Sequence, residues 1–65
     1  MFEAYSDLMS IGDVQEALYI SKNKVYDLLN SGELKGAFRI GRVWKIPREC
    51  VENYVRERAG LRKGN

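Results

Sequence analysis

The chain has 65 residues, 45% of them hydrophobic, with one cysteine, no histidine and a formal net charge of +2. A single cysteine excludes an intramolecular disulfide, and the lack of histidine excludes a cysteine–histidine zinc site. We expect one small domain over residues 1–65 that is stabilised by its hydrophobic core alone.

The charges are unevenly distributed along the chain. Residues 1–20 contain four acids and no base, whereas residues 21–48 contain seven bases and two acids, a balance of +5. A cationic segment on a compact scaffold suggests a polyanionic partner.

Several other classes of function are not expected. Catalysis usually needs a histidine or a carboxylate held in a pocket, and a nucleophile needs a neighbouring base. Cys50 has no such base nearby, so we expect it to be a small core hydrophobe. No metal or cofactor is expected. No apolar run approaches the ~18 residues of a membrane span, and the N-terminus lacks a signal-peptide pattern, which predicts a soluble intracellular protein.

The N-terminal part of the chain contains one predicted helix, at residues 11–18. Ser10 is suited to be its N-cap, with Asp13 three residues later, and apolar residues then recur at helical spacing. Residues 1–7 show no periodicity and are expected to be flexible. Leu8-Met9 either forms a short strand or covers the core.

A second helix is expected to begin after Ser21. Val25, Leu28 and Leu29 form its buried face by their spacing, and Gly32 is suited to the left-handed conformation that ends a helix. Two short helices joined by a short turn, with polar and basic side chains outside the second, make a helix-turn-helix.

Two β-rich segments then flank Gly41-Arg42, a pair suited to a type II′ hairpin turn. They are residues 38–40 and 43–46. A strict two-residue loop places Trp44 and Ile46 on the face opposite Phe38 and Ile40. Two solutions remain open: a bulge or longer loop that realigns the register, or a hairpin with both faces partly covered.

The last predicted element is a C-terminal helix. Pro47 ends the strand and is suited to the first turn of this helix, which runs to about Arg58 and is followed by Gly60. Its apolar stripe closes the core and consists of Cys50, Val51, Tyr54 and Val55. Residues 59–65 are expected to be a flexible basic tail.

The first turn of the second helix contains Lys22, Asn23 and Lys24. A recognition helix meets base edges in the major groove with this turn, where Asn can pair with adenine and Lys with guanine or phosphate. The hydroxyls of Ser21 and Tyr26 can reach phosphate. The alternative is an ordinary solvated surface, but lysines in a first turn oppose the helix dipole, which favours a contact role.

The hairpin contains Arg39, Arg42 and Lys45, with Arg42 at its tip. An arginine at the tip of a wing can enter a minor groove or clamp its phosphates. The alternative is that these charges protect an exposed edge strand from aggregation. Trp44 is expected to belong to the core.

Three motifs in succession resemble a known family. They are Ile20-Ser21-x-x-x-Val25-Tyr26, Ser31-Gly32-Glu33-Leu34 and Arg39-Ile40-Gly41-Arg42-x-Trp44-x-Ile46-Pro47-Arg48. From about Leu8 to Val55 the chain resembles excisionase-type DNA-binding proteins, which are winged helix-turn-helix domains of the MerR-like kind. The resemblance implies an α+β fold with two N-terminal helices, a β-hairpin wing and a C-terminal helix.

The resemblance also implies a function. Such proteins come from mobile elements, bind repeated sites on double-stranded DNA, bend it and steer an integrase or recombinase towards excision. Their second helix enters the major groove, their wing lies along the minor groove, and further copies occupy adjacent sites. The matching positions are Ser21, Lys22, Asn23, Lys24, Tyr26, Arg39, Arg42 and Lys45.

The chain departs from the family at two positions. Gln15 stands where the family often has alanine, and Tyr19 where it often has glycine in the turn. Tyrosine tolerates a positive φ poorly, so the turn either uses another conformation or accepts strain. Two other functions stay open: a small transcriptional regulator with the same module, and, more distantly, a protein-interaction module such as an antitoxin or adaptor.

Overall fold

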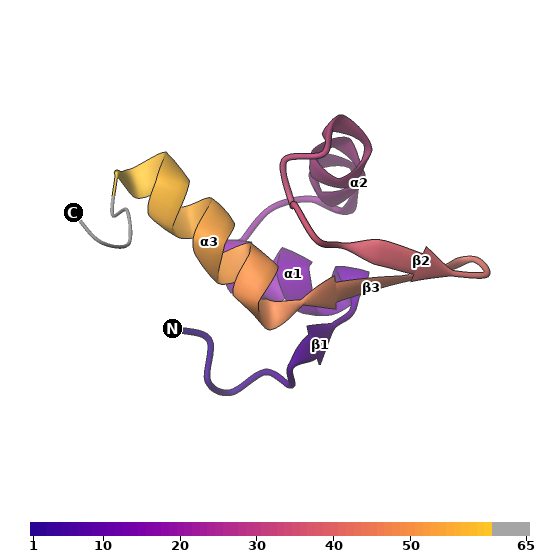
Figure 1. Ribbon diagram of the computed structural model, residues 1–65, viewed down its shortest axis with the longest axis horizontal. Helices are drawn as coiled ribbons and strands as arrows, with labels where there is room; N and C mark the ends of the chain where they lie inside the picture. The colour runs from indigo at the N-terminus through magenta and orange to yellow at the C-terminus, as the bar shows by residue number, and fades with distance from the viewer. Residues whose placement is uncertain (61–65) are drawn as a thin grey trace.

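A computed structural model describes residues 1–60 of the chain. The flexible tail was predicted at residues 59–65, but Ala59 is the last residue of a helix and Gly60 its C-cap, and the rest of the predicted tail, residues 61–65, lies outside the described residues. The described part contains three helices and three strands (Figure 1). In chain order they are β1 (Leu8–Met9), α1 (Ile11–Leu18), α2 (Lys22–Ser31), β2 (Phe38–Ile40), β3 (Val43–Pro47) and α3 (Arg48–Ala59).

Both N-terminal helices begin at the serine caps that the sequence predicts. The Oγ of Ser10 accepts the Asp13 N–H at 3.1 Å, and the Asp13 carboxylate accepts the Ser10 N–H at 3.1 Å, which completes a capping box. The Oγ of Ser21 accepts the Lys24 N–H at 3.2 Å. Gly32 ends α2 in the left-handed conformation, with φ +80°. Local sequence therefore sets the bounds of both helices.

The turn between α1 and α2 accepts strain. Tyr19 adopts the left-handed conformation, with φ 55° and ψ 46°. Its N–H and that of Ile20 both donate to the carbonyl of Gln15, so the bonds of a left-handed helix end are made without a glycine. A non-glycine residue in this conformation costs roughly 1–2 kcal/mol. The sequence left open whether this turn uses another conformation or accepts strain, and the structure has the strained conformation.

The three strands form one antiparallel sheet with β3 in the middle. Leu8 and Met9 of β1 pair with Pro47 and Ile46, so this apolar pair forms a strand, in which Met9 is buried in the core and Leu8 is exposed. On the other side β2 pairs with β3 across a strict two-residue loop, with Ile40 opposite Val43. Gly41 in that loop has φ +63°, as the first position of a type II′ turn requires.

The two faces of the hairpin differ in exposure. Trp44 and Ile46 face the core, whereas Phe38, Ile40 and Val43 point to the other side and are 43%, 62% and 55% exposed. The sequence left open a realigned register or a hairpin with both faces partly covered. The register is not realigned, and the second face is covered only in part, with Phe38 the least exposed of its three apolar residues. The reason is that β1 extends the sheet at its edge, so it adds no layer over this face.

The core joins the three helices to one face of the sheet. Its buried side chains are Met9, Val14, Val25, Leu28, Leu29, Leu34, Ile46 and Val51. Pro47 ends β3 and caps α3, whose partly buried Tyr54 packs against the same cluster. The order α1, α2, wing and α3 confirms the predicted α+β winged helix-turn-helix.

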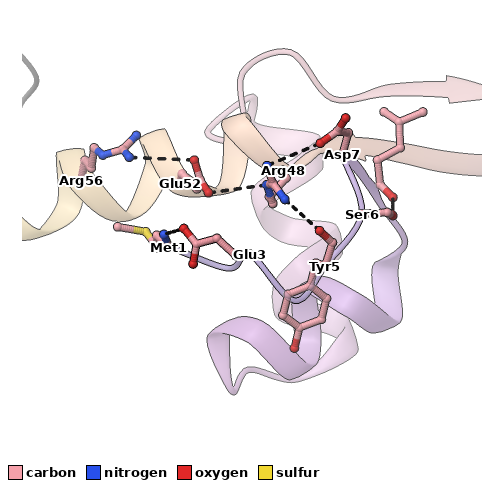
Figure 2. A network of polar contacts seen from close by, with 9 residues as sticks. Met1, Glu3, Tyr5, Ser6, Asp7, Arg48, Glu52 and Arg56 are labelled. Carbon is pink, nitrogen blue, oxygen red and sulfur yellow. Dashed lines mark hydrogen bonds and ion pairs between the residues drawn. The ribbon is translucent and has the colours of Figure 1, made fainter.

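The N-terminal segment is connected to α3 by one side chain. Figure 2 shows Arg48 between the carbonyl of Tyr5, at 2.9 Å from Nη1, and the carboxylates of Asp7 and Glu52, at 3.4 and 3.6 Å. The Tyr5 hydroxyl also donates to Glu16 of α1 at 2.7 Å. Residues 1–7 thus have partners on two helices, and their predicted flexibility stays a prediction. Among the described helices, none has the length and hydrophobicity needed to cross a membrane.

Candidate nucleic-acid interface

The start of α2 presents an uninterrupted polar surface. Ser21 caps the helix, and Lys22, Asn23 and Lys24 follow in its first turn, all of them exposed. The capping bond uses Ser21 Oγ as an acceptor, which leaves its hydroxyl proton free to donate to an anion. Tyr26 lies one turn after Lys22 on the same side of the helix and is 37% exposed.

The wing and this helix line one open hollow. The hollow has a volume of about 410 Å³ and is lined by Lys22 and Tyr26 of α2, by Arg42 of the hairpin loop with the first two residues of β3, and by α1 with the residue that caps it. Arg42, at the tip of the hairpin, is therefore brought to the same hollow as the recognition-helix residues. Three of the sequence-predicted residues, Lys22, Tyr26 and Arg42, line one site although they come from two distant parts of the chain.

The other two wing cations lie on opposite faces of the hairpin. Arg39 pairs with Trp44 across the strands, and its Cζ lies 5.4 Å from the centroid of the indole ring. Lys45 pairs with Phe38 and so belongs to the exposed apolar face. Neither of them lines the hollow.

The charge of these basic residues is not compensated by acids. Within residues 1–60, the ion pairs of basic side chains belong to Arg48 and Arg56, which contact Glu52 and Asp7. The candidate cations make none; they are Lys22, Lys24, Arg39, Arg42 and Lys45. Two of these unpaired cations, Lys22 and Arg42, line the hollow, where they produce a positive potential that attracts a polyanion.

Sequence reasoning did not assign Gln15 to the site. The structure places this half-buried residue of α1 on the wall of the hollow, beside Lys22 and Arg42. A signal was present in the sequence, because Ile11, Val14 and Leu18 define an apolar stripe at helical spacing. Gln15 falls on that stripe, where an amide is out of place.

The environment of the single thiol disfavours its thiolate form. Cys50 is partly buried, and burial raises the pKa of its thiol above the ordinary value, with the neighbouring Glu49 adding to the effect. A nucleophilic cysteine needs the opposite shift, because the thiolate is the reacting species. No group of three or more metal-ligating residues occurs in the part of the chain that the structure describes.

A family model described as a helix-turn-helix domain matches residues 8–59. The chain belongs to this helix-turn-helix family. The matched span begins at the first residue of β1 and ends at the last residue of α3, so it covers every element of the fold. No curated protein and no solved structure matches the chain. Membership of a helix-turn-helix family supports sequence-specific binding of double-stranded DNA and indicates a binding protein, not a catalyst.

Proposed function

We propose that this helix-turn-helix protein is an excisionase-type directionality factor of a mobile element, with a MerR-like wing. One observation carries the proposal: Lys22 and Tyr26 of α2 and Arg42 of the wing tip line a single hollow in which no acid takes part. A duplex offers two adjacent grooves separated by one phosphate backbone. Helix α2 in the major groove and the wing along the minor groove would place that backbone at the hollow.

The residues divide into two roles under this proposal. Asn23 reads a base edge, because a carboxamide can pair with adenine in the major groove. The other residues contact phosphate or follow the minor groove, and they are Ser21, Lys22, Lys24, Tyr26, Arg39, Arg42 and Lys45. Phosphate contacts fix the register of the protein on the duplex, while base contacts supply sequence preference.

The size of the domain supports an architectural role. A single small module buries roughly 600–1,000 Å² on DNA, less than most specific complexes need. We therefore expect several copies on adjacent sites, or an integrase beside them, acting in the cytoplasm at the nucleoid. Bending of the DNA by these copies would bring the integrase's sites together.

Base reading is tested by comparing two asparagines of α2. Asn23→Ala should cost ~1–3 kcal/mol of binding free energy on a duplex selected from a randomised library, and should relax preference at one base pair. Asn30→Ala, an exposed position near the end of the same helix, is the matched control and should change nothing. If Asn23→Ala weakens binding equally on selected and random duplexes, Asn23 has no base-reading role.

The directionality role is tested by recombination. An integrase encoded beside this gene should give more excision and less integration when the protein is added, and circularly permuted duplexes should migrate as bent DNA. Repression of a neighbouring operon, without an effect on recombination, would assign the protein to transcriptional regulation.

A further inference from the structure

The hollow between α2 and the wing has a third wall, which contains none of the residues proposed above to bind DNA. This wall is helix α1, which contributes Gln15 and the first turn at Ser10–Gly12. Gln15 shares the hollow with two cations and a phenol, and no acid lines it. Every charged group facing the space is therefore positive.

The side chain of Gln15 has no assigned partner. Its backbone carbonyl accepts two N–H groups in the turn, but within residues 1–60 its carboxamide makes no hydrogen bond. The residue is nevertheless half-buried, on the stripe that otherwise holds Ile11 and Val14. A carboxamide has two N–H donors, and among the described residues no side-chain nitrogen or oxygen is buried without a partner, so these donors are open to solvent and can reach a ligand in the hollow.

The donors around the hollow suit one kind of ligand. Lys22 and Arg42 supply positive charge, Tyr26 an O–H and Gln15 an N–H, so the set matches the unesterified oxygens of a phosphodiester. A base edge is a poorer match, because it mixes donors and acceptors and carries no charge.

We propose that this hollow seats one phosphodiester of the DNA strand that passes between the recognition helix and the wing, and that Gln15 of α1 donates to it. The inference rests on the proposed DNA binding and extends it to a helix outside the recognition element. A single phosphate held by α1, α2 and the wing fixes the angle between the two DNA-contacting elements. Gln15 thereby becomes a determinant of how the protein sits on the duplex.

Two variants separate this role from a structural one. Gln15→Ala removes the donors, and loss of one hydrogen bond to a charged group should weaken binding about tenfold. Gln15→Glu keeps the size but brings a negative charge to the phosphate, and should weaken binding by more than ~tenfold. In the free protein that carboxylate lies near Lys22 and Arg42, so the thermal midpoint should stay or rise. A residue that only packs against its neighbours is not expected to weaken DNA binding on substitution while the thermal midpoint stays or rises.

The decisive experiment locates the phosphate. A duplex selected from a randomised library is prepared with single neutral methylphosphonates at successive positions, and its affinity is measured for the wild-type chain, Gln15→Ala and the control Asn30→Ala. At one position the methylphosphonate should weaken the wild-type and Asn30→Ala chains more than Gln15→Ala, by about tenfold. The variant has already lost the Gln15 hydrogen bond and keeps only the contacts of Lys22, Arg42 and Tyr26.

Three results would overturn the inference. The first is equal sensitivity of Gln15→Ala and wild type at every phosphate, and the second is wild-type affinity of both Gln15 variants. In either of these two cases, the proposed DNA binding would still be supported if the wild-type chain bound a duplex in a salt-dependent way. The third is the absence of wild-type binding to any duplex, which would overturn the proposed function as well.

Discussion

The Arg39 guanidinium lies over the Trp44 ring, with Cζ 5.4 Å from the ring centroid, in a cross-strand pair of the wing. Trp44 packs against the core, so the core holds the indole that positions Arg39. A cation–π contact at an exposed site contributes roughly 0.5–1 kcal/mol. One of the predicted DNA-binding arginines is thus also part of the folded surface of the wing.

Arg39→Ala should therefore affect both stability and binding. We expect a loss of ~0.5–1 kcal/mol in the free energy of unfolding, measured in urea, together with weaker duplex binding. Arg42→Ala is the matched control, because Arg42 makes no such ring contact in the described residues. It should weaken binding with little change in stability. Equal stability losses for the two variants would contradict this division.

The close approach of Gly36 to Cys50 leads to a second prediction, about stability. A Cβ built at Gly36, where φ is +102°, would lie 2.5 Å from Cys50 Sγ. Gly36→Ala should lower the free energy of unfolding by ~2–3 kcal/mol, from backbone strain and overpacking together. Adding Cys50→Ala should relieve the overpacking, because the thiol that the new Cβ meets is then absent. The double variant should therefore lose less free energy of unfolding than the two single variants lose in sum. Additive losses would show that the thiol does not limit the space at Gly36.

The hydrogen bond from Tyr5 to Glu16 predicts a pH dependence. The bond to the carboxylate raises the pKa of the phenol to about 12, from 10.0. The folded state therefore retains a proton that the unfolded state releases, and this contribution to stability is complete below about pH 10 and is lost as the pH rises to about 12.

The check is the stability difference between wild type and Tyr5→Phe. It should favour wild type below pH 10 and shrink between about pH 10 and pH 12. Absorbance titration of the tyrosines should show the same group ionising late. A difference that is constant over this window would mean that the phenol is not held by Glu16.

Arg48 and Arg56 provide another matched pair. Both contact Glu52, but only Arg48 also reaches Tyr5 and Asp7 of the N-terminal segment. Arg48→Ala should cost ~1 kcal/mol of stability and should speed hydrogen exchange in β1, whereas Arg56→Ala should cost less than about 0.5 kcal/mol. Similar exchange rates in the two variants would show that Arg48 does not hold the N-terminus.

Features encoded by neighbouring residues could be predicted from the sequence. The serine caps, Gly32 and the turn at Gly41 act within a few residues of themselves, and the structure has each as expected. The strand at Leu8 stayed open, because its partner Pro47 is far away in the chain. The role of Arg48 was missed for the same reason, since its contacts lie in a segment with no periodicity.

The same distinction, between local contacts and contacts distant in sequence, applies to the candidate site. The first turn of α2 could be identified because the cap and its lysines are contiguous in sequence. The sequence could not show that Arg42 and Gln15 share a hollow with Lys22, because three separate elements must fold before that wall exists. The extent to which Phe38 and Ile40 are exposed could not be predicted either, since the cover of their face depends on where β1 lies in the sheet.

The most direct test of the central claim is the salt dependence of binding to a selected duplex. The logarithm of the association constant should fall linearly with the logarithm of salt concentration, with a slope of ~0.9 per phosphate contacted. Lys22→Ala and Arg42→Ala should each reduce that slope by about 1, while Arg56→Ala, whose charge is paired on α3, should leave it unchanged. Binding that is absent, indifferent to salt, or equally steep in all three variants would contradict a cationic surface shared by α2 and the wing.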